Sequence, residues 1–326
     1  MNSRTDHGVL TTGNTKALSA LYHAFAAGDI EAAANFVTDD YLLHVPGRQP
    51  NAGEYWGRHG LKTFMANNHA YNGGLFKLTV PVLVVTGDDA FTREVVTINR
   101  QHDPERSFVL RVTNQFKMRN GMVAESWLVP EDQYAYDEYY AHLPFGGFAA
   151  PRQARGHGSA GRVQPLVSPE HTIFADSTAM LAEMYREFWR GNGDAMRELI
   201  ADDVIVNITH NSAISGTYRG WAGYMNFRER LMAIAGDKYK LDVTALAGNH
   251  TDVFATEHIR MNRVWDPRVQ TIDVIMHFEI RDGKIVQMDD FPVDPYAWES
   301  FYVAPHNGKN ALARKVTAFS ASSADD

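Results

Sequence analysis

The chain repeats itself almost end to end at one constant spacing. Aromatic residues, glycines and acids of the first half recur 163 positions later in the second half. The first-half members of these pairs include Tyr22, Phe25, Gly28, Asp39, Gly53, Tyr55, Gly57, Phe64, Glu94 and Asn99. One residue is then missing from the second copy, and the match continues at a spacing of 162 from Phe116 and Phe278 to Tyr140 and Tyr302. A spacing this regular indicates two copies of one domain.

The repeat sets the domain boundaries. We assign residues 14–148 to the first domain and residues 171–305 to the second. Residues 149–170 are rich in Gly, Pro, Arg and Ser and lack apolar periodicity, which is typical of a linker. We expect a loose arm at 1–13 and a flexible tail at 306–326. Two domains agree with a length of 326 residues.

The composition argues against several classes of protein. The net charge is −8, whereas nucleic-acid binding requires a basic surface. Cysteine is absent, which excludes disulfides, thiolate metal sites and cysteine nucleophiles. The polar N-terminus lacks the apolar region of a secretory signal, and no apolar run reaches the roughly 18 residues of a membrane span. We therefore expect a cytoplasmic protein that binds neither nucleic acid nor membrane.

Each copy changes from helical to strand periodicity once. Apolar residues recur at helical spacing around Leu18 and Leu181, and strand-like segments follow the helices. In the first copy the long segments are 75–85, 90–101, 107–119 and 122–129. Asn120-Gly121 and Asp282-Gly283 predict tight hairpin turns, because both central residues of a type I′ turn need φ > 0. This order predicts an α+β fold in which three N-terminal helices pack on a curved antiparallel sheet.

The stretch from His44 to Arg58 resembles the SnoaL-like branch of the NTF2-like superfamily. It combines an apolar strand, a Pro-Gly pair, a loop of small residues, and Gly-x-Tyr-x-Gly leading into the third helix. Tyr-x-x-Phe-x-x-Gly-Asp at 22–29 and Gly-x-Val/Ile at 121–123 and 283–285 are also similar to that family. The resemblance implies two tandem NTF2-like cone domains, each with an apolar pocket. Cyclases, isomerases, epoxide hydrolases, dehydratases and plain ligand binders share this fold, so only the pocket residues can identify the function.

The resemblance implies a catalytic aspartate on the final strand, where SnoaL-type cyclases have the general base of an aldol ring closure. In the second copy this position is Asp290, and Asp289 stands where the family usually has tryptophan. The first copy keeps Trp127 but has Leu128 in place of the acid. Burial in an apolar pocket would raise the carboxyl pKa towards that of a useful base. Adjacent strand residues face opposite ways, so only one of Asp289 and Asp290 is expected to face the cavity; the alternative is a solvated acidic strand end.

An enolate also needs a hydrogen-bond donor for its developing oxyanion. His258, Arg260 and His277 precede the acid on neighbouring strands and are the candidates of the second copy. His258 and Arg260 have the same strand parity and therefore share a face. The alternative is that each histidine is structural or exposed.

The first copy has a separate set of candidate ligand-binding residues. They are His44, Arg93, Arg111, Glu125 and Trp127. An aromatic ring beside these charged groups could bind an anionic or carbonyl-bearing aromatic ligand. The alternative is that Trp127 belongs to the core and Arg93 to the surface.

These residues predict a cofactor-independent cyclase or isomerase that acts by enolate chemistry on an apolar, polyketide-like carbonyl substrate in the second pocket. One alternative is an epoxide hydrolase or dehydratase-type enzyme, with Arg260 beside Asp289 or Asp290. Another is a non-catalytic small-molecule-binding protein. No dinucleotide-binding, phosphate-loop or metal-ligand motif occurs, so we expect no cofactor and no metal.

Two copies in one chain can also pair with each other. Relatives of this fold usually associate through the outer face of the sheet. We therefore expect an intramolecular pseudo-dimer, and the sequence leaves a further homo-oligomer open.

Overall fold

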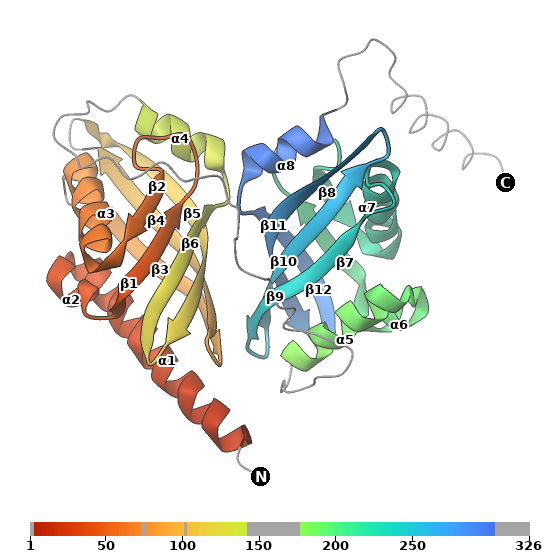
Figure 1. Cartoon of the computed structure of the whole chain (residues 1–326), viewed down its shortest axis with the longest axis horizontal. Coiled ribbons are helices and arrows are strands. Elements are labelled where there is room, and N and C mark those ends of the chain that lie inside the picture. The colour runs from red at the N-terminus through yellow and green to blue at the C-terminus, as the bar shows by residue number, and fades with distance from the viewer. Residues whose placement is uncertain (1–2, 74–75, 101–102, 142–176, 304–326) are drawn as a thin grey trace.

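The computed structural model describes residues 3–73, 76–100, 103–141 and 177–303 (Figure 1). The linker at 149–170 and the tail at 306–326 lie outside the described residues, as does the end of the first domain. No helix within these ranges is both long enough and apolar enough to cross a membrane.

The two domains have the same order of elements. The first contains α1 Ser3–Ala27, α2 Ile30–Ala34, β1 Val37–Val45, β2 Gly53–Trp56, α3 Gly57–Asn72, β3 Phe76–Thr86, β4 Asp89–Arg100, β5 Asp103–Arg119, β6 Met122–Pro130 and α4 Gln133–Ala141. The second contains α5 Ser177–Arg190, α6 Gly193–Leu199, β7 Ile200–Ile208, β8 Gly216–Arg219, α7 Gly220–Ile234, β9 Lys240–Gly248, β10 Asp252–Arg263, β11 Asp266–Arg281, β12 Lys284–Pro292 and α8 Pro295–Tyr302. The predicted α+β fold, present twice, is confirmed.

Each domain has one six-stranded sheet. The strand orders are β2-β1-β6-β5-β4-β3 and β8-β7-β12-β11-β10-β9. The pairs β1–β6 and β7–β12 are parallel, and every other named pair is antiparallel. The parallel pair places the first long strand of a domain beside its last one, which brings residues far apart in the chain to the same cavity wall.

The predicted hairpin turns are confirmed by their backbone angles. Asn120 and Gly121 have φ of 54° and 75°, and Asp282 and Gly283 have φ of 52° and 73°. Positive φ at both central positions is the signature of the type I′ turn. The turn sets the first pairs of β5 with β6 and of β11 with β12, and a one-residue irregularity directly after these pairs shifts the register in both copies. The turn and this irregularity together decide which residues of the final strand face inward.

The second glycine of the Gly-x-Tyr-x-Gly motif is required for steric reasons. Gly57 and Gly220 have φ of 66° and 69°, and a Cβ there would lie 2.8 Å and 3.0 Å from the carbonyl oxygens of Asp39 and Asp202. A side chain would therefore meet both backbone strain and a clash. The glycine lets the chain turn closely over the first strand and begin α3 or α7.

The structure corrects the expectation of a loose arm at residues 1–13, because most of this segment is helical. Helix α1 begins at Ser3 and runs without a break into the first domain. Its middle is held to the β3–β4 turn, because Asn14 Nδ2 donates to the Gly87 carbonyl at 2.8 Å and Gly87 N–H donates to Thr11 Oγ1 at 3.2 Å. The helix has no strong apolar stripe before residue 14, so periodicity did not reveal it.

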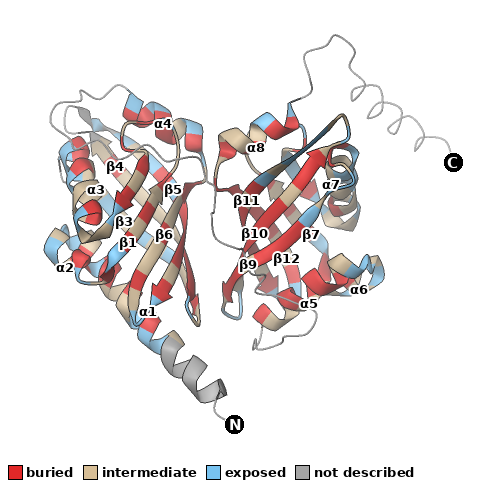
Figure 2. Cartoon of the chain, viewed as in Figure 1, coloured by how far each residue is buried: buried red, intermediate tan, exposed pale blue. Residues whose placement is uncertain are grey.

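In each domain the helices cover one face of the sheet and enclose a hydrophobic core (Figures 1 and 2). The opposite faces of the two sheets pack on each other. Their shared apolar cluster consists of Val84, Phe91, Val129, Ala245, Ala247, Phe254, Ile275, Phe291 and Val293. Contact between two sheet faces removes apolar surface of both domains from water.

Matched residues of the two copies meet across this interface. Phe91 and Phe254, which are 163 positions apart, stack with ring centroids 5.3 Å apart. Tyr134 and Tyr296, which are 162 positions apart, meet edge to face at 5.1 Å. Contacts between equivalent residues are those of a two-fold interface. An intramolecular pseudo-dimer in solution, alone or inside a larger homo-oligomer, stays a prediction.

Truncation of Phe91 tests the interface. Phe91 is fully buried, so we expect Phe91→Ala to lower the free energy of unfolding by about 3–5 kcal/mol and to separate the unfolding of the two domains. Urea unfolding followed by tryptophan fluorescence and calorimetry measures both effects. Val109→Ala is the control, because Val109 is half exposed. Equal stability of the two variants, with one transition in each, would show that the sheets are not packed in solution.

Candidate functional site

Each domain encloses an apolar cavity between its helices and the inner face of its sheet. The first cavity has a volume of about 190 Å³ and the second about 90 Å³. An engineered protein cavity of about 150 Å³ lined by Leu, Ile and Phe binds benzene. The first cavity therefore accommodates a one-ring ligand as it stands, and the second must widen to do so.

Asp290 lines the second cavity from β12 and is therefore the one of the two adjacent aspartates that faces inward. Burial raises the pKa of its carboxyl to about 8, against the opposing effect of its bonds with Thr209, and the charge of Glu257 raises it further. Thr209 N–H donates to Asp290 Oδ1 at 2.5 Å. Within the described chain, Asp290 Oδ2 has no hydrogen-bond partner. The acid is thus held by one oxygen and unpaired at the other.

A second acid, Glu257, lines the same cavity and was not among the predicted site residues. Burial raises the pKa of its carboxyl to about 7, although the Tyr185 hydroxyl donates to Glu257 Oε1 at 2.7 Å. Glu257 lies on β10, and Asp290 lies two strands away across β11. Two carboxyls with raised pKa values therefore share one apolar cavity, which is an arrangement often found where protons are transferred.

Helix α8 supplies two polar groups to this cavity. Trp298 and Tyr302 line it, and both Trp298 Nε1 and the Tyr302 hydroxyl are buried without a hydrogen-bond partner among the described residues. A buried donor that makes no bond costs free energy. A ligand with an acceptor atom would remove that cost.

The rest of the second cavity wall is rich in flexible side chains. Five methionines line it: Met184, Met232, Met261, Met276 and Met288. Arg228 also lines it and places its guanidinium 5.0 Å from the Phe188 ring. Methionine side chains repack at low cost, so this cavity can enlarge around a ligand.

Asp289 and His277 do not reach the second cavity, which corrects the prediction for both. Strand alternation turns them to the outer face of the sheet, where they lie beside Arg93 of the first domain. His277 Nδ1 is 3.4 Å from Asp289 Oδ2 and 3.5 Å from Arg93 Nη1, and its Nε2 is 2.9 Å from Asp252 Oδ1. These residues form a charged cluster between the domains.

Most contacts of this cluster join opposite charges, although Arg93 opposes the protonation of His277. Burial alone would lower the pKa of His277, but its hydrogen bonds to Asp252 and Asp289 raise it overall. Burial would raise the pKa of Asp289, but bonds from His277, Asn207 and Gln287 lower it overall. Arg93 completes the cluster with an ion pair to Glu131 at 2.6 Å. The cluster therefore pairs opposite charges across the interface.

His258 and Arg260 also face away from the second cavity, which corrects their predicted placement. They share a face, as expected, but it is the outer one. His258 Nδ1 pairs with Asp273 at 2.7 Å, and Arg260 pairs with Asp242 at 2.8 Å. Both side chains are therefore held by acidic partners on the opposite side of the sheet from Asp290.

The candidate ligand-binding residues of the first copy lie outside the first cavity for the same reason. His44 Nε2 is 2.8 Å from Glu125, and the His44 ring stacks on Trp127 at 5.1 Å on the outer face of β1 and β6. Arg111 is exposed. Arg93 belongs to the interdomain cluster. None of these five residues lines the cavity enclosed by the described part of the first domain.

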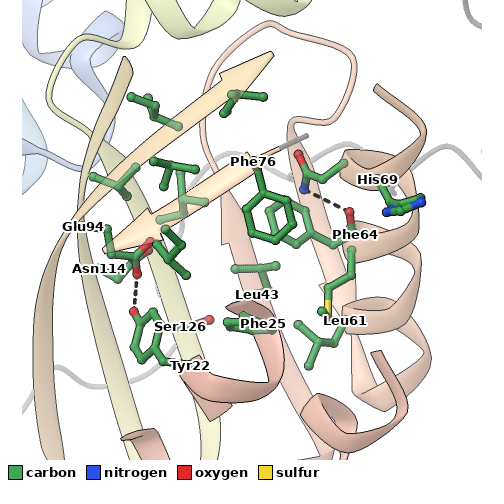
Figure 3. A pocket seen from close by; sticks show the side chains of 18 of the residues that line it. Tyr22, Phe25, Leu43, Leu61, Phe64, His69, Phe76, Glu94, Asn114 and Ser126 are labelled. Carbon is green, nitrogen blue, oxygen red and sulfur yellow. Dashed lines mark hydrogen bonds between the residues drawn. The ribbon is translucent and has the colours of Figure 1, made fainter. Parts of the chain in front are cut away.

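The polar end of the first cavity is built around Glu94, the match of Glu257 (Figure 3). Its Oε1 accepts hydrogen bonds from the Tyr22 hydroxyl, Thr92 and Asn114. Burial raises the pKa of Glu94 to about 7, although these bonds lower it. Figure 3 shows Glu94, Asn114 and Tyr22 together on one side of the cavity, with apolar side chains across from them.

The sequence contained a signal for Glu94 and Glu257 that comparison of the copies passed over. Both acids occur at the same position of the repeat, inside strands whose inward neighbours are apolar, such as Val96 and Ile259. The signal was that both copies have an acid at a strand position whose neighbours on the same face are apolar. Across the described ranges, no group of three or more His, Asp or Glu is arranged to hold a metal ion.

A family model for the SnoaL-like domain matches the chain twice, at residues 18–126 and 181–288. No curated protein matches it. Among solved structures, Bal32a from a soil-derived mobile gene cassette is 23% identical, over 40% of this chain and 98% of its own, with a TM-score of 0.37. TerC, co-crystallised with polyporic acid, is 18% identical over 39% of this chain and 98% of its own, with a TM-score of 0.36. A candidate SnoaL-like polyketide cyclase from Jannaschia sp. CCS1 is 14% identical over 41% of this chain and 96% of its own, with a TM-score of 0.36.

The buried carboxyls predict a pH-dependent stability. An unfolded carboxyl releases its proton near pH 4, whereas Asp290 keeps it in the folded state up to about pH 8. The folded state thus binds more protons between these values, and the free energy of unfolding falls as the pH rises through this window. The amide of Asp290→Asn resembles the neutral acid and does not ionise. We therefore expect the free energy of unfolding to fall between pH 5 and pH 8 by at least about 2 kcal/mol less in Asp290→Asn than in the wild type.

Urea unfolding at both pH values measures this difference. The control is Glu198→Gln, because Glu198 is exposed on α6. A wild type and an Asp290→Asn variant with the same pH dependence would show that Asp290 is not buried as a neutral acid.

Proposed function

The chain belongs to the SnoaL-like domain family, with one copy of the domain in each half, and we propose that its second domain is a cofactor-independent acid–base enzyme. Its reaction is removal of a proton α to a carbonyl of an apolar substrate. Cyclases and isomerases both begin with this step, and a polyketide-like molecule offers the activated carbonyls that it requires.

One observation carries the proposal. A carboxyl oxygen and two hydrogen-bond donors, all buried and unpaired within the described chain, belong to residues that line the same cavity. They are Asp290 Oδ2, Trp298 Nε1 and the Tyr302 hydroxyl. Enolate formation needs this combination, since a base must take a proton from carbon while donors stabilise the charge that develops on oxygen.

The geometry supports a short reaction sequence. Asp290 Oδ2 takes the proton from the α carbon, and the electron pair of that C–H bond moves to the carbonyl oxygen. Tyr302 O–H and Trp298 Nε1–H donate to the resulting enolate oxygen. Return of the proton from Asp290 to another carbon gives an isomer; attack of the enolate carbon on a second carbonyl of the same substrate closes a ring, with the proton passing to the new alkoxide.

The surroundings of Asp290 suit this role. A base works best when its pKa lies near the working pH, and burial brings that of Asp290 to about 8. Glu257, with a pKa of about 7, is a second group in the cavity that can hold or release a proton in the same range. The flexible methionines allow the small cavity to widen for a substrate.

The hydrolase alternative loses the residue on which it depended. It required Arg260 beside an aspartate of the cavity, and Arg260 instead pairs with Asp242 on the outer face. A purely ligand-binding second domain would leave the raised pKa of Asp290 without a chemical use. We therefore favour proton transfer at carbon.

Exchange of α protons for deuterium tests the proposal without knowledge of the natural substrate. Incubation of apolar ketones such as 2-indanone and 2-tetralone in D₂O, followed by NMR, measures enolate formation directly. We expect Asp290→Asn to lower the catalysed rate about 10²–10⁴-fold and Tyr302→Phe to lower it about 10²-fold.

Arg260→Gln is the matched control, because Arg260 lies on the same sheet but on its other face, and we expect it to leave the rate unchanged. Exchange that survives in Asp290→Asn but fails in Arg260→Gln would reverse the assignment. Asp290→Asn that folds normally and exchanges at the wild-type rate would exclude Asp290 as the base.

A further inference from the structure

We propose that the first cavity is a separate binding site for an apolar ligand that presents a hydrogen-bond donor, a hydroxyl or an ammonium group, to Glu94. The second cavity offers unpaired donors and so suits an acceptor such as a carbonyl. The two copies would then differ in the ligands that they select, because the described wall of the second cavity has unpaired donors in addition to its carboxyls. This proposal concerns the first domain and does not depend on catalysis in the second.

The size and lining of the first cavity favour a ring-containing ligand. Its volume of about 190 Å³ exceeds that of a cavity that binds benzene, so no rearrangement is required. The wall opposite Glu94 includes the apolar and aromatic side chains of Leu61, Phe64 and Phe76, with His69 beside them (Figure 3). Apolar contact on this side would supply affinity, and the polar end would supply selectivity.

The hydrogen bonds at the polar end leave an acceptor for the ligand. All the hydrogen bonds that the described chain gives to Glu94 fall on Oε1, which leaves Oε2 for a ligand. The Tyr22 hydroxyl is used by Glu94 and Thr92, and the Asn114 amide nitrogen donates to Glu94. The Ser126 hydroxyl is paired with the Tyr41 hydroxyl at 2.5 Å. Each of these side chains therefore already makes a hydrogen bond within the described chain, whereas Glu94 Oε2 makes none.

The charges around the cavity exclude an anionic ligand. No Lys or Arg is among the described residues that line it, and Glu94 is its only carboxyl. A carboxylate ligand would be buried beside a like charge with no partner, which is strongly unfavourable. The second cavity differs at the corresponding points, since Arg228 lines it and Asp290 replaces Leu128.

The ionisation of Glu94 gives the site a second measurable property. Above its pKa of about 7 the group is a carboxylate, and a charged acceptor forms a stronger bond with a donor than a neutral one. The tyrosines that face it are Tyr22 on α1, Tyr41 on β1, and Tyr136 and Tyr140 on α4, and burial raises the pKa of each. His69 on α3 is the other side chain of the described wall whose type ionises near neutral pH.

Four compounds of one shape test the chemistry. They are p-cresol, 4-methylbenzylamine, p-xylene and 4-methylbenzoate, and isothermal titration calorimetry gives their affinities. We expect at least one of the two donors to bind about 10-fold more tightly than p-xylene at pH 8, and 4-methylbenzoate to bind more weakly than p-xylene. Comparison of the affinities of p-cresol and 4-methylbenzylamine shows whether the site prefers a hydroxyl or an ammonium group. Binding of the benzoate as tight as that of the donors would overturn the proposal.

Matched variants identify the cavity. Glu94→Gln should reduce the preference for the donor over p-xylene to less than about 3-fold and leave p-xylene binding intact, which also shows that the cavity is still folded. Glu257→Gln, the same change at the matched position of the second cavity, should leave the preference unchanged. Loss of the preference in Glu257→Gln alone would place the ligand in the other cavity and overturn the proposal.

The pH dependence gives a further test. The preference for the donor should increase from pH 6 to pH 8 in the wild type and in His69→Gln, and should be flat in Glu94→Gln. A rise that disappears in His69→Gln would assign the effect to His69 and contradict the proposal. None of these measurements involves proton exchange, so they keep their meaning whether or not Asp290 proves to be catalytic.

Discussion

The two faces of each sheet decide the chemistry of this protein, because successive residues of a strand point to opposite sides. On β4, Glu94 faces the first cavity and Arg93 faces the other domain. On β12, Asp290 faces the second cavity and Asp289 faces the other domain. These inward residues meet the helices and the cavities, and these outward residues meet the other domain. A shift of one residue in register would exchange the acid in the cavity, Asp290, for the acid at the interface, Asp289.

This constraint explains how much the sequence could predict. The α+β fold, the duplication and the turn at Asn120-Gly121 follow from local patterns that periodicity and backbone preference make visible. Parity also showed that His258 and Arg260 share a face. It could not show which face, because that depends on how the helices and the second domain cover the sheet.

The residues of the two cavities were predicted only in part, because the sequence analysis concentrated on differences between the copies. Comparison of the copies drew attention to residues that differ, and this succeeded for Asp290. It passed over Glu94 and Glu257, which are alike in both copies and therefore looked like part of the scaffold. The buried carboxyl is common to both cavities, whereas the second acid and the unpaired donors of α8 distinguish one cavity from the other. Residues shared by the two copies of a duplicated domain can thus line its cavities as well as maintain its fold.

The central residues of the charged cluster between the domains, Arg93, His277 and Asp289, are not shared by the two copies. Arg93 meets His277 and Asp289, whereas the matched residues of the first copy are Gln115 and Trp127. Two first domains brought together in the same way would bury two arginines without these partners, and two second domains would bury the acid and histidine without an arginine. In the fused chain Arg93 instead lies 3.7 Å from Asp289 of the other domain, in addition to its partner Glu131 in its own domain. The charged contacts between the two sheets are therefore specific to the pairing of the first copy with the second, even though the two halves keep the same fold.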